Sequence, residues 1–202
     1  MAVRPVELFF DPICPYAWMT SRWLLHAAEV REIAPTFSVM SLAVLNEGRD
    51  LDPGYRRSMD DAWGPARVAI QVDCTAGKDK LLEFYTAFGE RFHVGGSDDR
   101  RACAAAALEE AGLPADLIDV YDTEQVDDPL RSSHQRAIDM VGDDVGTPVV
   151  SFGGGTAYFG PVVSPAPRGE EAGVLFDGLE ALTRVHGFFE IKRSRTGGVD
   201  FS

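Results

Sequence analysis

The stretch FFDPICPYAWMTSRWLL contains the side chain best suited to chemistry in this chain, the thiol of Cys14. Cys14 lies between Pro12 and Pro15, where an apolar run ends and a helical pattern begins. A cysteine at the start of a helix faces unpaired backbone N–H groups and the positive end of the helix dipole, which favour the thiolate. We therefore predict that Cys14 is a nucleophile with a lowered pKa.

The second cysteine of a C-x-x-C motif is missing, because Ala17 occupies its position. A dithiol enzyme releases a mixed disulfide by attack from its own second thiol, and alanine cannot do this. A single cysteine can still form a mixed disulfide that a small thiol from solution then resolves. The alternative is that Cys14 is an inert, buried residue, but its place between two prolines at a strand-to-helix turn favours a reactive thiol.

The remaining cysteines and the histidines give no sign of a metal site or a disulfide framework. Cys74 and Cys103 are distant from each other and from Cys14, and we interpret both as packing or helix-end residues. No pair of histidines has the spacing of metal ligands. Three cysteines without a pairing pattern, and an N-terminus without an apolar signal segment, predict a protein of the reducing cytoplasm.

Hydrophobic periodicity predicts a βαβ unit at the start of the chain. Residues 6–10 form an apolar run that predicts a buried strand, and a helical pattern follows from Pro15. Residues 35–45 alternate as a second strand would. The two strands should be parallel, since a helix connects them.

The middle of the chain has helical patterns and almost no strand signal. Four helical segments are expected between residues 52 and 142, in the ranges 52–72, 78–92, 97–112 and 127–142. The stretch TPVVSFGGGTAYFG then predicts a hairpin with a glycine turn, and residues 168–185 predict a final helix. This order of elements predicts an α/β thioredoxin-like fold: one domain whose core comprises about 1–46 and 143–202, with a helical insertion of about 47–142.

Composition excludes several kinds of partner. The chain has 202 residues, 45% of them hydrophobic and 25% charged, as is usual for a globular protein. Its net charge of −13 argues against binding to nucleic acid or to an anionic membrane surface, because no basic stripe offsets it. Association as a homodimer stays open, since nothing in the sequence decides the oligomeric state.

Several separated motifs, in order, resemble the DsbA-like thioredoxin-fold proteins, and most closely the actinobacterial mycothiol-dependent nitroreductase family. Besides the segment around Cys14, they are VMSLAVLNEGRD, AWGPARVAI, ERFHVGG, VGTPVV, YFGPVVSPAPRGEEAG and GFFEIKRSRT. The resemblance implies that Cys14 is the nucleophile, that Pro15 and Tyr16 are the intervening dipeptide, and that Thr147 and Pro148 form a cis-proline loop facing the thiol. It also implies mycothiol as a thiol cosubstrate, with no tightly bound cofactor.

The chain departs from the family pattern at two positions. Ala17 replaces the usual second cysteine, and Tyr16 replaces the usual tryptophan. The resemblance further suggests four residues that contact the thiol or the substrate, with weaker support than Cys14: Trp18, Asn46, Trp63 and His93.

Three functions are compatible with these residues. The first is a monothiol, thiol-dependent oxidoreductase that forms a mixed disulfide between Cys14 and a low-molecular-weight thiol. Its substrate would be a small apolar or nitroaromatic compound, or a protein mixed disulfide. The second is a nonredox thiol transferase or isomerase similar to the kappa-class glutathione transferases. The third is a binding scaffold that lost redox activity with its second cysteine.

Overall fold

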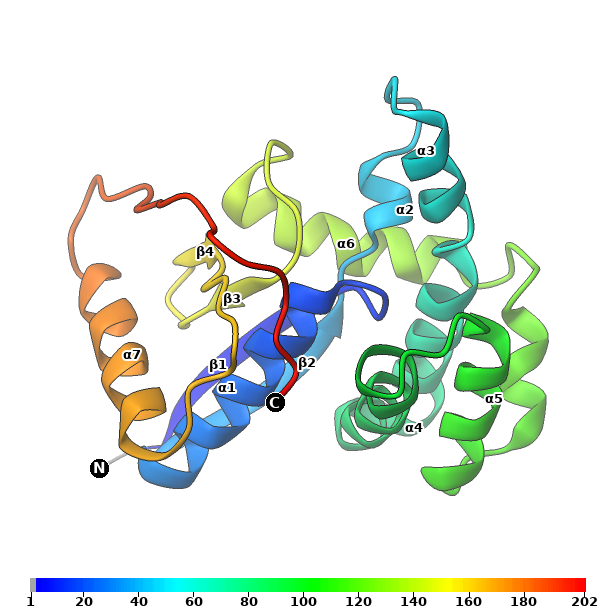
Figure 1. Ribbon diagram of the computed structural model, residues 1–202, viewed down its shortest axis with the longest axis horizontal. Coiled ribbons are helices and arrows are strands. Elements are labelled where there is room, and N and C mark those ends of the chain that lie inside the picture. Colours follow the sequence, from blue (N-terminus) through cyan, green and yellow to red (C-terminus); the bar gives the residue numbers. More distant parts are fainter. Residues whose placement is uncertain (1–2) are drawn as a thin grey trace.

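A four-stranded mixed sheet organises the molecule, and the computed structural model describes residues 3–202 (Figure 1). The strands are β1 (Arg4–Phe10), β2 (Ile33–Val39), β3 (Val149–Ser151) and β4 (Ala157–Phe159). Their order across the sheet is β2-β1-β3-β4. The pair of β1 and β2 is parallel, while β3 is antiparallel to both β1 and β4. The predicted parallel pair and the predicted hairpin are therefore confirmed.

Strand β1 separates two apolar layers because its successive side chains point to opposite faces of the sheet. Val6, Leu8 and Phe10 belong to the main core cluster, which also contains Trp23 of the first helix. Phe9 belongs to a second cluster on the other face. The strand is thus buried from both sides, which explains why residues 6–10 form a nearly continuous apolar run.

Helices α1 (Pro15–Val30) and α7 (Gly169–Leu182) pack against each other beside the sheet. The indole Nε1–H of Trp23 donates to the carbonyl of Ala172 across this contact, at 3.1 Å. Pro15 occupies the first helical position, where its missing N–H costs nothing. The helix start is therefore as predicted, and it makes Cys14 the N-cap residue.

The second predicted strand is too long, because β2 ends at Val39 rather than at residue 45. The short helix α2 (Leu42–Leu45) replaces its second half. Two side chains induce this change: the Ser41 hydroxyl accepts the Val44 N–H at 3.3 Å, and the Asp11 carboxylate accepts the Leu42 N–H at 2.6 Å. Both oxygens satisfy helix N-terminal donors, which alternation along the sequence does not reveal.

All elements between α2 and β3 are helical. Most of them lie together to one side of the sheet, whereas the last one covers the sheet face that carries Phe9 (Figure 1). These elements are α3 (Pro53–Asp60), α4 (Trp63–Gly89), a π-helical turn η1 (Glu90–Val94), α5 (Arg100–Glu110), a 3-10 turn η2 (Ala115–Val120) and α6 (Asp127–Val141). The helical content predicted for this region is confirmed. Its treatment as an insertion of about 47–142 in a single domain stays a prediction.

Two of the predicted helix boundaries in this region are wrong. The predicted segment 52–72 is divided after Asp60, so Gly64 and Pro65 fall in the first turn of α4, where proline is tolerated. The predicted gap before residue 78 is a kink at Gly77, whose φ is 83°. Only glycine adopts this left-handed conformation readily, so α4 changes direction there without leaving the helix block.

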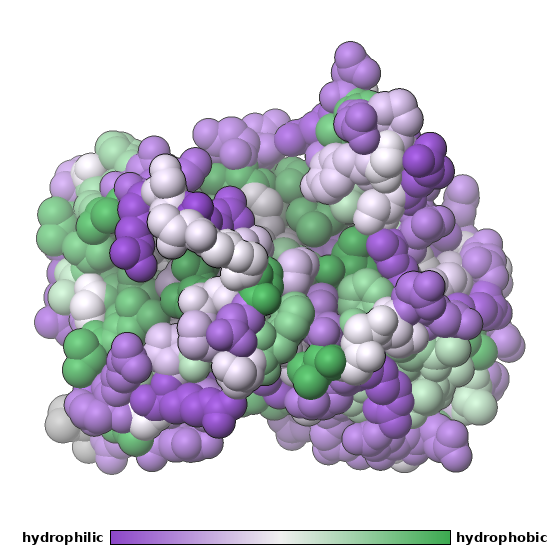
Figure 2. Space-filling model, viewed as in Figure 1, coloured by the Kyte–Doolittle hydropathy of each residue, from purple (hydrophilic) through white to green (hydrophobic). Residues whose placement is uncertain are grey.

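The surface differs between the two sides of the molecule. Figure 2 shows apolar residues gathered over the side that carries α7 and the hairpin, whereas the helical block is largely hydrophilic. Large apolar side chains exposed on that side include Phe159 and Val174. Within residues 3–202, no helix combines the length and the apolar character that crossing a bilayer requires.

Candidate active site

The Cys14 sulfur lies at the N-terminus of α1, with a hydrogen-bond donor on one side and an acceptor on the other. The Ala17 N–H points at Sγ, with an N to S distance of 3.4 Å. The thiol in turn donates to the Thr147 carbonyl, with an S to O distance of 3.4 Å. Only 7% of the residue is exposed. A sulfur that donates to a carbonyl is protonated, so this arrangement suits the neutral thiol.

Thr147 and Pro148 belong to the loop that enters β3, and the peptide bond between them is cis. The structure therefore brings this loop against Cys14, although the two lie 133 residues apart in the sequence. The Thr147 hydroxyl is buried and has no hydrogen-bond partner among the described residues. It is a polar group next to the sulfur that a bound molecule could satisfy.

The predicted lowering of the Cys14 pKa is not what the structure shows. Burial is the largest influence and raises the pKa of the thiol above its usual value. The Ala17 N–H opposes this effect, and the nearby Asp11 carboxylate adds to it. The sequence reveals the helix N-terminus but not the extent of burial, and burial outweighs the helix contribution here.

Asp11 is a candidate functional residue that the sequence analysis overlooked. Its carboxylate is fully buried and accepts two backbone N–H groups, from Ile13 at 2.9 Å and from Leu42 at 2.6 Å. It thereby ties the turn before Cys14 to the start of α2. Burial raises the pKa of Asp11 to about 6, despite the two hydrogen bonds. The sequence contains a signal for this role, because Asp11 is an acidic residue directly after a predicted buried strand.

His93 contacts the same turn from the helical block. Because a carbonyl can only accept, the ring Nε2–H must donate to the Pro12 carbonyl, at 2.9 Å. Burial lowers the pKa of His93 to about 4, so its ring is neutral. Trp18, which is 2% exposed, stacks on this ring at a centroid distance of 5.8 Å. Trp18 and His93 thus lie together beside the turn, with Trp18 as a buried support.

The other residues of the motif line the start of α1. Ala17 is fully buried, and Tyr16 is partly buried, with the Arg195 guanidinium 4.7 Å from its ring centre. Pro15 begins the helix. None of the three cysteines, all of which lie within residues 3–202, forms a disulfide. Cys74 lies exposed on α4, and Cys103 is buried in α5.

Asn46 follows the last residue of α2, and Trp63 is the first residue of α4. Asn46 donates from Nδ2 to the Leu42 carbonyl at 2.9 Å and so ends α2. Trp63 packs against the small apolar cluster that contains Ile13, and the guanidiniums of Arg67 and Arg131 lie 4.9 and 5.3 Å from its ring. Direct contact of either residue with a thiol or substrate stays a prediction.

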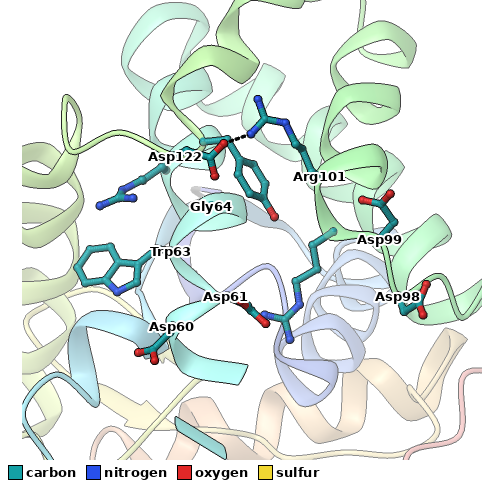
Figure 3. A pocket seen from close by; sticks show the side chains of 11 residues that line it. Asp60, Asp61, Trp63, Gly64, Asp98, Asp99, Arg101 and Asp122 are labelled. Carbon is teal, nitrogen blue, oxygen red and sulfur yellow. Dashed lines mark hydrogen bonds and ion pairs between the residues drawn. The ribbon is translucent and has the colours of Figure 1, made fainter. Parts of the chain in front are cut away.

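Trp63 also lines two hollows in the helical block, each of about 420 Å³. The first, shown in Figure 3, is surrounded by aspartate and arginine side chains, including an ion pair between Arg101 and Asp122. Neither hollow is lined by Cys14, Thr147 or Pro148. No group of three or more potential metal ligands occurs among residues 3–202.

Comparisons with known proteins agree with this geometry. The chain is 27% identical to the uncharacterised protein Rv2286c of Mycobacterium tuberculosis, over 95% of this chain and 82% of that one. Two solved structures share its fold. The oxidoreductase DsbA of Xylella fastidiosa has a TM-score of 0.53 at 15% identity, with 88% of this chain and 86% of that chain covered.

The second structure is the cytosolic disulfide reductase DsbM of Pseudomonas aeruginosa with GSH, with a TM-score of 0.53 at 14% identity and coverage of 88% and 100%. These likenesses establish a DsbA-like thioredoxin fold, as the order of elements predicted. The model of the Rv2466c-like family, described as mycothiol-dependent nitroreductase Rv2466c, matches residues 13–193, which include Cys14 and the Thr147 loop. The chain therefore belongs to the Rv2466c-like, mycothiol-dependent nitroreductase family.

Proposed function

We propose that the protein is a thiol-dependent oxidoreductase in which Cys14 is the nucleophile and mycothiol is the thiol cosubstrate. The observation that carries this proposal is the position of Sγ between the Ala17 N–H and the Thr147 carbonyl. An attacking sulfur needs donors that stabilise its negative charge, and the N-terminus of α1 supplies them. Membership of a mycothiol-dependent family supports the choice of thiol.

The proposed reaction uses one protein thiol and two mycothiol units, one of them already joined to the substrate. The Cys14 thiolate attacks the mycothiol sulfur of a mixed disulfide between mycothiol and the substrate, the S–S bond breaks, and the substrate leaves as a thiolate. Cys14 then carries a mixed disulfide with mycothiol. A second mycothiol thiolate attacks the mycothiol sulfur of that bond, forms mycothiol disulfide and returns Cys14 to its reduced state. The substrate leaves as a free thiol, and the two mycothiol units leave as mycothiol disulfide.

A nitroaromatic compound is the second class of oxidant that the family description supports. Reduction of a nitro group to a nitroso group takes two electrons and two protons and releases water. Two mycothiol thiols supply these and become mycothiol disulfide. Near Cys14, the partly buried ring of Tyr16 offers a flat surface for an electron-poor aromatic ring.

A nonredox function is the competing proposal, favoured by a specific observation. Ala17 lacks a thiol, and the Cys14 thiol is buried and protonated, as suits a residue that only holds a small thiol in place. Such a transferase or isomerase would resemble the kappa-class glutathione transferases. Product analysis separates the two, because only the oxidoreductase generates mycothiol disulfide.

The free state of the cysteines also supports a proposal for the cellular compartment of the protein. All three cysteines are free, and the exposed thiol of Cys74 would be vulnerable in an oxidising environment. We therefore propose that the protein works in the cytoplasm, where small thiols stay reduced. The net charge of −13 makes nucleic acid an unsuitable partner.

The test is the intact mass of the reduced protein after exposure to mycothiol disulfide. We expect one adduct of mycothiol mass, located on Cys14 by peptide mapping, that excess mycothiol removes. Cys14→Ser should abolish this adduct, whereas Cys74→Ser, the matched control, should retain it. Absence of an adduct on Cys14 would refute the redox proposal and favour the nonredox alternative.

A further inference from the structure

The segment after α7 returns across the molecule and ends beside α1 (Figure 1, red). We call residues 195–202 the strap. Three of its contacts join it to other segments of the chain. The Arg195 guanidinium lies over the Tyr16 ring, the Phe201 ring stacks on His93 at 5.9 Å, and the Asp200 N–H donates to the Ser164 hydroxyl at 2.7 Å.

Two of these contacts involve residues close to Cys14, and the third ties the strap to the loop after the hairpin. Tyr16 is the second residue after Cys14 in the active-site motif. His93 donates to the carbonyl of Pro12, two residues before Cys14. Ser164 belongs to the loop that follows β4, in which the Ser164–Pro165 bond is cis. The strap therefore bridges the helical block, the motif and the loop after the hairpin.

The contacts of the strap are few and individually weak. A cation-π contact at an exposed site and a single aromatic pair are both weak interactions. Most of the strap is exposed, and only Val199 and Phe201 are partly buried against the main core. Detaching it would leave the sheet and helices α1 to α7 intact, since none of the strap residues belongs to them.

The site itself needs such a movement. Cys14 is only 7% exposed, whereas attack on a disulfide requires its sulfur to align with the two sulfurs of the substrate. Cys14 itself is held by α1 and the Thr147 loop, through the Ala17 N–H and the Thr147 carbonyl. The strap contacts Tyr16 and His93 next to the turn that carries Cys14, and weaker contacts hold it there.

We propose that the strap is a gate that determines which substrates reach Cys14, admitting small disulfides and excluding protein disulfides. Its biological meaning rests on the proposed function, because a gate for substrates presupposes a reactive thiol. Opening separates Phe201 from His93 and Arg195 from Tyr16. A small molecule needs only a partial or brief opening, whereas a protein disulfide needs the whole strap displaced.

The experiment measures how fast Cys14 is alkylated in the full chain. Iodoacetamide serves as the small probe and a polyethylene-glycol maleimide as the bulky one, with sites quantified by peptide mass. The exposed Cys74 is the internal standard for each probe. The alkylation rate of Cys14 is proportional to the fraction of molecules with the strap open, provided that the strap opens and closes faster than the probe reacts.

The test variant is Arg195→Ala combined with Phe201→Ala, and the matched control is Phe189→Ala. Phe189 lies in the same segment but is 84% exposed and outside the strap. We expect the Cys14 to Cys74 labelling ratio to rise about tenfold in the double variant, as loss of the two contacts predicts. The rise should be larger for the bulky probe, and Phe189→Ala should leave both ratios unchanged.

An unchanged ratio in the double variant, or an equal rise with both probes, would overturn the proposed gate. A circular dichroism spectrum and an unfolding midpoint close to those of the parent protein exclude general loosening as the cause of a rise. The mycothiol disulfide experiment tests the proposed function independently of the gate. Faster alkylation without a mycothiol adduct would retain the gate and refute the proposed function.

Discussion

At the scale of single residues, the environment of Cys14 is a balance between burial and hydrogen bonding. Burial raises the pKa of the thiol, while the Ala17 N–H lowers it. Asp11 adds a negative charge that also raises the pKa. The reactivity of this cysteine is therefore governed as much by its neighbours as by its place at a helix N-terminus.

Replacing Asp11→Asn should lower the pKa of Cys14, since the variant removes a negative charge that opposes the thiolate. The asparagine oxygen can still accept one of the two N–H groups that the carboxylate binds. Thiolate absorbance in the ultraviolet, followed against pH, measures the change. Asp79→Asn, at an exposed position of α4, is the control and should leave the titration unaltered. A higher Cys14 pKa in Asp11→Asn would contradict this account.

Replacing Ala17→Cys should restore a dithiol motif. Side chains three residues apart at the start of a helix are about 5–6 Å apart at Cβ, close enough for a modest backbone shift to allow a disulfide. We expect the oxidised variant to form a disulfide between Cys14 and the introduced cysteine. A mixed disulfide with mycothiol should become short-lived in this variant, because the new thiol resolves it.

Thiol titration of the oxidised Ala17→Cys variant measures this pairing. The folded variant should show the exposed thiol of Cys74, and unfolding should add only the buried thiol of Cys103. Ala17→Ser is the matched control, and it should titrate as the parent protein does, with the Cys14 thiol still free. Titration of the Cys14 thiol in the unfolded, oxidised Ala17→Cys variant would refute the expected pairing.

At the scale of elements, the contact between α1 and α4 positions the turn that carries Cys14. Trp18 of α1 lies against Gly89 at the end of α4, where a Cβ atom would overlap the indole ring. The same indole packs edge-on to Tyr85 and stacks on His93. Gly89 therefore permits the close approach that brings His93 to the Pro12 carbonyl.

Replacing Gly89→Ala should destabilise the protein by about 1–3 kcal/mol or more, because the added methyl overlaps a fully enclosed ring and forces α1 and α4 apart. Gly178→Ala is the matched control, since nothing lies within 4 Å of a Cβ at that position of α7. It should be neutral or stabilising by up to about 1 kcal/mol, as expected for alanine in a helix. Urea denaturation measures both, and equal effects of the two substitutions would contradict the packing argument.

At the scale of the whole molecule, buried ionisable groups make the free energy of unfolding depend on pH. Burial lowers the pKa of His93 and of His134 to about 4, so both rings are neutral in the folded protein. Burial raises the pKa of Asp11 to about 6, which has the opposite consequence. The two histidines and the aspartate therefore affect the free energy of unfolding over the same range of pH, with opposite signs.

The free energy of unfolding should fall as the pH decreases from about 6.5 to about 4, because the unfolded chain then binds protons that the two buried rings refuse. Each histidine contributes at most about 3 kcal/mol to this decrease in the free energy of unfolding, and Asp11 offsets part of the combined decrease. His134→Asn should reduce the slope, as denaturation at a series of pH values would show. Ser132→Ala, at an exposed position of the same helix and without an ionisable group, is the control and should preserve it. An unchanged slope in His134→Asn would contradict the proposed origin.

Much of this protein was determined by its sequence alone. The apolar run of β1, the proline at the start of α1 and the glycine turn of the hairpin are local signals, and each predicted its element. The same local signals placed Cys14 at the N-terminus of a helix. Helix caps and strand runs depend on neighbouring residues, which is why they can be read without a structure.

Only the tertiary structure decided how these pieces meet. The Asp11 carboxylate holds the start of α2, which ended β2 early, and the Thr147 carbonyl reaches the sulfur from a distant loop. Burial of Cys14 reversed the expected direction of its pKa, and Phe201 reached His93 from a distant part of the chain. Desolvation and long-range contacts depend on the packing of the whole molecule, so no local pattern in the sequence encodes them.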